Sequence, residues 1–142
     1  MSTPVNVAVP ATSDSPNSAG SPRWMVITGW VLTLLPAALL IMSGTMKLIG
    51  GPDLEKGMEQ TGIPVSVAKP LGIVEIVSTV IYLIPQTAVL GAILLTGYMG
   101  GAIATHVRLE EPFIMQTIIG VVVWLGIYMR DARLRQLIPL RR

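Results

Sequence analysis

Glu75 is the residue whose type and position most strongly suggest chemistry in this sequence. It lies within an apolar stretch at residues 65–84, where an unpaired carboxylate must take up a proton or find a partner. At about 100° per residue, Gly72, Thr79 and Tyr82 fall on the same stripe of a helix as this carboxylate. We expect the stripe to face the protein interior, where Glu75 either exchanges protons or, as a neutral acid, hydrogen-bonds to a neighbouring helix.

Three further polar residues, Lys47, His106 and Gln116, lie near the ends of apolar stretches. Lys47 follows Ser43 by one helical turn, and a lysine at a helix end can reach the membrane surface without any other role. A lone histidine is either an interfacial polar residue or a group that titrates near neutral pH. If successive stretches run in opposite directions, all three share one membrane level with Glu75. We therefore predict a polar pocket that opens outward, with an ion pair or hydrogen bond between Lys47 and Glu75 at its centre. The predicted pocket residues are Ser43, Lys47, Glu75, Thr79, Tyr82, His106 and Gln116.

Four apolar stretches must position these residues. They occupy residues 24–49, 65–84, 87–107 and 112–129, and each is near the ~20 residues that cross a membrane. The sequence therefore predicts an all-α fold, an integral membrane four-helix bundle with up-down-up-down topology, within a domain at 23–142. Residues 1–22 are rich in Ser, Thr, Asn, Ala and Pro, which predicts a disordered N-terminal tail.

Prolines set the expected ends and bends of these helices. Pro36 lies inside the first stretch and should bend it. The second helix either starts near Pro64 and kinks at Pro70, or starts at Pro70 and is short. Pro85 and Gln86 predict a tight turn, which makes the second and third helices antiparallel neighbours.

Composition supports a membrane protein and excludes several functions. Of the residues, 51% are hydrophobic and only 13% are charged, a balance outside the average of soluble domains. The sequence has no cysteine, which excludes disulfides, thiolate metal sites and a dithiol relay within this chain. The formal charge is only +2, and no basic patch alternates with aromatic residues, so nothing indicates nucleic acid. We expect no metal site, and the lipid bilayer as a partner.

Basic residues are distributed unevenly between the two sides of the predicted bundle. One side carries Arg23, Arg130, Arg133, Arg135, Arg141 and Arg142, and the other carries Lys47, Lys56, Lys69 and Arg108. The side richer in Lys and Arg usually faces the cytoplasm. We therefore expect a multi-pass protein with both its N- and C-termini in the cytoplasm.

A ladder of small residues lies in the third stretch, at Gly97, Gly101 and Thr105. Small residues four positions apart allow helices to pack closely in a membrane, although glycine is common in membrane helices for other reasons. Close packing at this ladder predicts that Gly101→Leu disrupts the fold or assembly more than Gly126→Leu.

The sequence resembles the DoxX-like family of small bacterial membrane proteins over about residues 30–140. The resemblance rests on SGTMKL at 43–48, GIVEI at 72–76, YLIPQTAVLGAILLTGYMGGAIATHVR at 82–108 and YMRDARLRQLIP at 128–139. It implies a four-helix protein of the cell (inner) membrane. It also implies polar residues at the motif positions of Lys47, Glu75 and His106. The family takes its name from a subunit of a thiosulfate:quinone oxidoreductase, and relatives are often described as parts of membrane redox systems.

Two functions of different kinds follow. The first is a subunit or accessory component of a quinone-linked membrane redox system, in which Glu75 and His106 exchange protons, Lys47 tunes the carboxylate, and a quinone and a redox partner subunit are implied. The alternative is a non-catalytic membrane protein that binds a partner, a second copy of itself or a small lipophilic ligand. A pocket large enough for a ring near Glu75 favours the first function, and tight packing around Glu75 favours the second.

Overall fold

The computed structural model describes residues 22–137, and every regular element in that part of the chain is helical. The all-α prediction is confirmed. The predicted tail lies, apart from Pro22, outside the described residues. The helices are α1 (Arg23–Ile49), α2 (Pro52–Thr61), a short 3-10 helix (Val65–Val67), α3 (Ala68–Leu83), α4 (Ala88–Arg108), α5 (Ile114–Arg130) and α6 (Ala132–Leu137).

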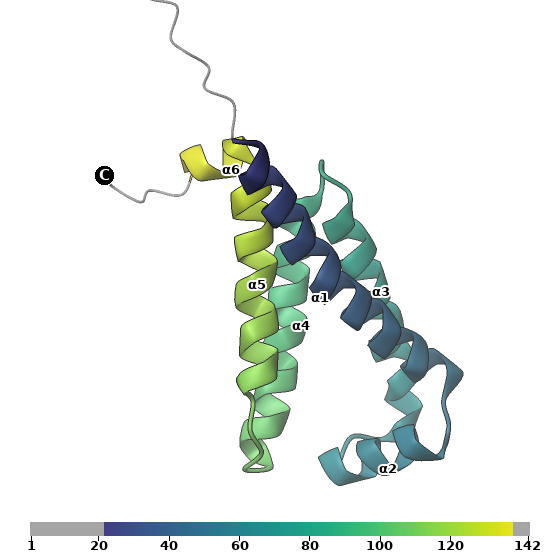
Figure 1. Ribbon diagram of the computed structural model, residues 1–142. Helices are drawn as coiled ribbons and strands as arrows, with labels where there is room; N and C mark the ends of the chain where they lie inside the picture. Colours follow the sequence, from purple (N-terminus) through teal and green to yellow (C-terminus); the bar gives the residue numbers. More distant parts are fainter. Residues whose placement is uncertain (1–21, 138–142) are drawn as a thin grey trace, which may run out of the picture.

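The four long helices form two pairs, α1 with α3 and α4 with α5. The pairs meet at one end and separate at the other (Figure 1). Helix α1 packs against both α3 and α5, α3 packs against α4, and α4 packs against α5. The start of α1, the α3–α4 turn and the end of α5 lie together, and we name this the closed end. The end of α1, the start of α3 and the α4–α5 loop make the open end, beside which α2 lies (Figure 1).

Glycines explain why the closed end is closed. A Cβ atom on Gly91 would overlap the backbone of Tyr82, so α3 and α4 touch there through their main chains. A Cβ atom on Gly29 would lie 2.8 Å from the backbone nitrogen of Arg130, and one on Gly126 would lie 2.8 Å from Thr33 Oγ1. Side chains at these glycines would push the helices apart.

The small-residue ladder of α4 does not pack against any other helix among the described residues, so the expectation of close packing there is wrong for the fold of the single chain. Cβ atoms on Gly97, Gly100 and Gly101 would meet no atom within 4 Å. The reason is that α4 buries a different face, which carries Ala88, Gly91, Ala92, Leu95 and Met99. For the fold of the single chain, the expected order of Gly101→Leu and Gly126→Leu is therefore reversed, because Gly126 is the packed residue.

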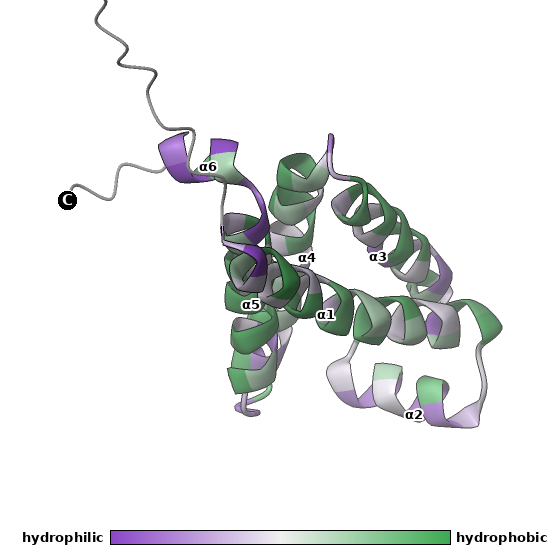
Figure 2. Cartoon of the chain, turned by 45° about the horizontal axis from the view of Figure 1, so that its top comes forward, coloured by the Kyte–Doolittle hydropathy of each residue, from purple (hydrophilic) through white to green (hydrophobic). Residues whose placement is uncertain are grey.

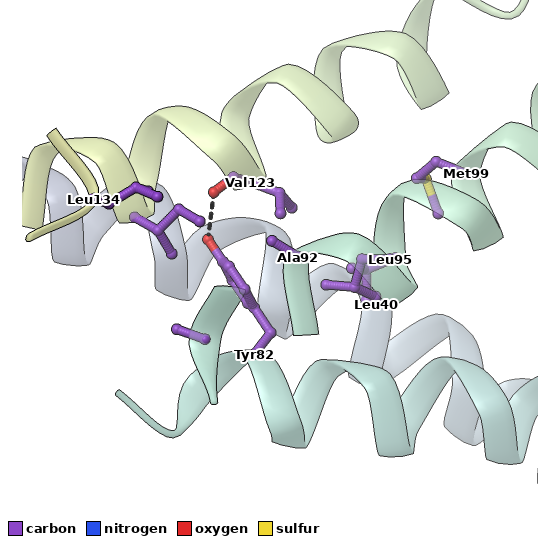
Figure 3. Packing of buried hydrophobic residues seen from close by; sticks show 9 residues of the cluster. Leu40, Tyr82, Ala92, Leu95, Met99, Val123 and Leu134 are labelled. Atoms are coloured by element: carbon purple, nitrogen blue, oxygen red, sulfur yellow. Dashed lines mark hydrogen bonds between the residues drawn. The ribbon is translucent and has the colours of Figure 1, made fainter. Parts of the chain in front are cut away.

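Tyr82 connects the helices in the core near the closed end (Figure 3). Its side chain is fully buried, and its hydroxyl donates a hydrogen bond of 2.9 Å to the carbonyl oxygen of Val123 on α5. The same hydroxyl lies 3.4 Å from Thr33 Oγ1 on α1. Leu95 and Ile127 complete this part of the core, both with about 1% of their surface exposed. The hydroxyl of one tyrosine of α3 thus contacts both α1 and α5.

Three helices of the described chain are long and apolar enough to cross a membrane: Arg23–Ile49, Val65–Leu83 and Ala88–Arg108. Helix α5 is also apolar but has only 17 residues. Figure 2 shows that hydrophobic residues cover much of the long helices, whereas α2 and α6 are more hydrophilic. Large apolar side chains of these helices are exposed, among them Leu34, Ile93 and Val121. Such surfaces need lipid or a partner, because monomeric soluble proteins rarely expose them contiguously.

The two prolines of the long helices sit differently. Pro36 is buried within α1. Pro70 is the third residue of α3, which begins at Ala68, between the two starts that the sequence left open. A proline in the first turn removes no helical hydrogen bond, because the first N–H groups of a helix have no partner within it.

Candidate functional site

The candidate site is centred on a pair formed between α1 and α3. Lys47 lies in the last turn of α1 and Glu75 in the middle of α3, and Lys47 Nζ is 2.9 Å from Glu75 Oε2. Glycines let the two helices approach, since a Cβ atom on Gly72 would lie 2.8 Å from the carbonyl oxygen of Gly44. The structure therefore forms the pair that the spacing of these residues suggested.

Two hydroxyl groups complete this arrangement, which we call the Glu75 cluster: Ser43, Lys47, Glu75 and Tyr98. Lys47 Nζ donates to Ser43 Oγ at 2.6 Å, and Tyr98 Oη donates to Glu75 Oε2 at 3.1 Å. The side chain of Glu75 is only 2% exposed, whereas that of Lys47 is 20% exposed. A buried carboxylate needs both a cation and hydrogen-bond donors. Glu75 Oε2 has the Lys47 ammonium group as its cation and the Tyr98 hydroxyl as a hydrogen-bond donor.

Tyr98 is the member of the cluster that the sequence analysis missed. It lies in α4, far from the other members in sequence. A signal for it existed, because a tyrosine within an apolar helix usually finds a partner for its hydroxyl when buried. The sequence alone does not show which polar group that partner is.

A cavity of about 410 Å³ adjoins the Glu75 cluster, between the two helix pairs. Its polar lining comes from Ser43, Lys47 and Glu75 on one side and from Gln116 of α5 on the other. The rest of its wall is apolar: Leu39, Leu40, Met99, Ala102, Met115 and Ile119. An apolar cavity with a few converging polar groups, within the range of about 300–1,000 Å³, is typical of small-molecule sites.

A second cavity, of about 670 Å³, lies between the end of α1 and helix α2. Ser43 and Lys47 line both cavities. The α2 side of this second cavity includes Leu54 and Met58, and its surface is mainly apolar. The ammonium group of Lys47 therefore lies on the boundary between a cavity beside α2 and a cavity between the helix pairs.

His106 lies next to the first cavity without lining it. Its Nδ1 is 2.9 Å from the carbonyl oxygen of Ala102, and its Nε2 is 3.0 Å from the amide nitrogen of Gln116. Since a carbonyl oxygen can only accept, Nδ1 is the donor, and Nε2 of the neutral ring accepts from the amide. Gln116 Oε1 is buried and has no hydrogen-bond partner within residues 22–137. His106 therefore contacts two residues of the cavity lining, Ala102 and Gln116, while Glu111 Oε2 lies 3.9 Å from its Nε2.

Thr79 and Tyr82 are buried but belong to the packing of α3. Thr79 Oγ1 donates to the carbonyl oxygen of Glu75 at 2.7 Å within its own helix, and Tyr82 binds to α5 as described above. Neither residue lines the cavity beside Glu75. The structure thus brings Ser43, Lys47, Glu75 and Gln116 together and leaves these other residues outside.

The chemistry of the site is that of hydrogen bonding and proton exchange. Lys47 and the Gln116 amide are donors, the Glu75 carboxylate is an acceptor when ionised, and Tyr98 can be either. Within residues 22–137 there is no group of three or more His, Cys, Asp or Glu side chains placed to hold a metal ion.

Comparison with known proteins finds one family. Residues 31–129, which include the whole Glu75 cluster, match the DoxX-like family. No curated protein and no solved structure matches the chain significantly.

Proposed function

The chain belongs to the DoxX-like family, and on this premise we propose that it is a component of a quinone-linked redox system in the membrane. That it is a membrane protein follows from the family together with its apolar helices. The quinone and the redox partner are our proposal, and one observation carries it. A cavity of about 410 Å³ is lined by the ion pair of Lys47 and Glu75, whose carboxylate is buried between the long helices.

The proposal includes an arrangement in the membrane. We place α1, α3, α4 and α5 across the bilayer, with the closed end and both termini toward the cytoplasm. Helix α5 is then ~26 Å long, slightly less than the ~30 Å hydrocarbon core. The arginines of the closed end support this orientation, because cytoplasmic ends carry an excess of basic residues. Those in the described residues are Arg23, Arg130, Arg133 and Arg135.

Reporter tags test this orientation. Tags inserted at residue 10 and after residue 142 should report the cytoplasm, and a tag near Asp53 should report the opposite side. Reports of the opposite kind would move the cavity to the inner leaflet and would contradict the proposed topology.

A quinone suits the cavity because its ring is flat and apolar and its oxygens accept hydrogen bonds. Lys47 and Gln116 stand on different sides of the cavity with donors for such oxygens. Reduction of a quinone takes up protons together with electrons. We assign the proton exchange to Glu75, whose carboxylate is held by Lys47 and Tyr98. We assign the supply of electrons to a redox partner subunit in the membrane.

Binding of a short-chain benzoquinone analogue to the detergent-purified protein tests the site. Lys47→Met removes a charged donor and should weaken binding roughly tenfold. Lys56→Met is the matched control, because Lys56 lies on α2, is exposed and lines neither cavity. Equal affinity in Lys47→Met and Lys56→Met would contradict the proposed site.

Glu75→Gln separates the redox function from simple ligand binding. The amide keeps hydrogen-bonding capacity, so the fold should persist, while quinone-linked turnover in membranes should be lost. If the variant supports turnover as the unaltered protein does, the assignment of proton exchange to Glu75 is contradicted. If the unaltered protein binds the analogue but supports no quinone-linked turnover, the chain is instead a protein that holds a lipophilic ligand without redox chemistry.

A further inference from the structure

The closed end contains a cavity that the proposed function does not use. It has a volume of about 290 Å³ and lies between α1, the α3–α4 turn and the junction of α5 and α6. Trp30 forms one wall, Gln86 another, and Arg130, Asp131 and Arg133 line the side at the junction. We propose that this cavity binds the phosphodiester headgroup of an anionic phospholipid.

Arg130 is held in place by the protein but keeps an unused donor. Its Nη2 donates to the carbonyl oxygen of Tyr82 at 3.1 Å, and its guanidinium carbon lies 4.5 Å from the centre of the Trp30 ring. Its Nη1 is buried and has no hydrogen-bond partner among the described residues. A buried donor without an acceptor is unfavourable, and a phosphate oxygen in the cavity would give this guanidinium an acceptor.

The charges around the cavity match a single negative charge. Arg130 and Arg133 contribute positive charges, and Asp131 contributes a negative one. The Asp131 carboxylate already accepts a hydrogen bond of 2.8 Å from the backbone nitrogen of Arg133. One positive charge therefore remains uncompensated, and a phosphodiester carries one negative charge. Arginine is well suited to phosphate because its planar fork can bind two oxygens at once.

An apolar stripe beside the cavity favours a lipid over a free phosphate. Ile27 and Leu34 lie on the same face of α1 as Trp30, three residues before it and four after it, and both are exposed. A headgroup in the cavity would therefore have an apolar helix face along which its acyl chains can lie. Hydrophilic residues gather at α6, where the headgroup region of a bilayer would meet this end (Figure 2).

Native mass spectrometry of the purified full chain, titrated with phosphatidylglycerol, tests the proposal. Arg133→Gln should weaken phosphatidylglycerol binding roughly tenfold, and it should leave the fold intact because this side chain is exposed. Arg23→Gln is the matched control, since Arg23 is exposed at the start of α1 and does not line the cavity. Equal binding in the two variants would overturn the proposal.

Two further measurements define the ligand and the role of Arg130. Phosphatidylglycerol should raise the melting temperature, whereas phosphatidylcholine and free glycerol phosphate should not; equal stabilisation by either of them would overturn the assignment to an anionic lipid. Arg130→Lys keeps the charge but loses the fork, so it should weaken phosphatidylglycerol binding while the protein remains folded by size-exclusion chromatography. Unchanged lipid affinity in folded Arg130→Lys would contradict the use of Arg130. Quinone binding is a separate readout that neither arginine variant should change.

Discussion

The closed end and the open end of this molecule differ in which helices pack against one another. At the closed end, glycines such as Gly91 and Gly126 bring helices into contact with almost no space between them. At the open end, the α1–α3 pair separates from the α4–α5 pair, and the Glu75 cluster adjoins the cavity between them. Small residues thus decide which helices meet: at the open end Gly44 and Gly72 bring α1 and α3 together, and the ion pair between these two helices lines the cavity that separates them from α4 and α5.

Each end also stabilises a cation in its own way. Arg130 at the closed end has a carbonyl oxygen and the faces of two aromatic rings as partners. Lys47 at the open end has a carboxylate and a hydroxyl. The partners of Arg130 are thus a carbonyl oxygen and aromatic faces, whereas Lys47 pairs directly with the carboxylate of Glu75. The difference explains why proton chemistry is assigned to the open end alone.

The largest effect is expected from Gly91→Ala. The added methyl group would overlap the backbone of Tyr82, which cannot move without shifting α3. We expect a loss of about 3 kcal/mol or more, at the upper end of overpacking effects, measured as loss of folded protein in a detergent denaturation series. Gly97→Ala on the same helix is the control, because its methyl group meets open space. Similar losses in both variants would show that the closed end is not packed through Gly91.

The next effect concerns the pair at the open end. Glu75→Leu leaves the Lys47 ammonium without its carboxylate and should cost about 3 kcal/mol, and adding Lys47→Met should restore part of this loss. A double-mutant cycle in bicelles gives the coupling energy of the pair. Coupling indistinguishable from zero would mean that Tyr98, and not Lys47, is the partner that matters to Glu75.

The sequence predicted the helices better than it predicted how they pack. Apolar runs of about 20 residues give long helices because lipid leaves the backbone no other partner, and the expected helix at 87–107 is α4, Ala88–Arg108. Packing of α4 was mispredicted because it has two glycine-bearing faces, and sequence does not show which one meets a neighbour. Helix α2 was missed because it is not apolar, although Pro52 at its first position and Gly62 after its end are recognised helix signals.

The candidate site was partly predictable for a related reason. Glu75 is conspicuous in an apolar helix, and helix direction alone places Lys47 at its level. The partner of His106, which is Gln116, was harder to infer. Several polar residues lie at the same membrane level, and the 3.0 Å contact between His106 and Gln116 depends on how α4 and α5 are rotated about their axes. The contact between Tyr98 and Glu75 depends on the rotation of α4 in the same way, since nothing in the sequence of α4 shows that Tyr98 faces Glu75.

A smaller effect is expected from removing the hydroxyl of Tyr82 near the closed end or of Tyr98 in the Glu75 cluster. Tyr82→Phe removes the bond to the Val123 carbonyl and should lower stability by about 1 kcal/mol without changing the affinity for the quinone analogue. Tyr98→Phe removes a donor from Glu75 and should weaken that affinity roughly fivefold. Thermal unfolding and ligand titration give the stability and the ligand affinity of each variant. If Tyr82→Phe also weakened ligand binding, the two ends would be coupled and not independent.

The smallest effect concerns α2, which lies beside the open end and buries only Met58. Arg108 at the end of α4 donates a hydrogen bond of 2.7 Å to the carbonyl oxygen of Thr61 at the end of α2, in an exposed position. An exposed bond of this kind contributes about 0.5 kcal/mol, so Arg108→Gln should leave the melting temperature nearly unchanged.

Hydrogen exchange should detect this loss where melting does not. The amides of Gly62 and Ile63 bond to carbonyl oxygens of α2, and their exchange should become roughly twofold faster in Arg108→Gln, since a region with few buried contacts opens locally. Lys56→Gln is the control, because Lys56 lies on the same helix and is exposed. A large fall in melting temperature in Arg108→Gln would mean that α2 holds the two helix pairs together at the open end. The space beside Glu75 would then depend on this tether, and not on the absence of glycine contacts between the pairs.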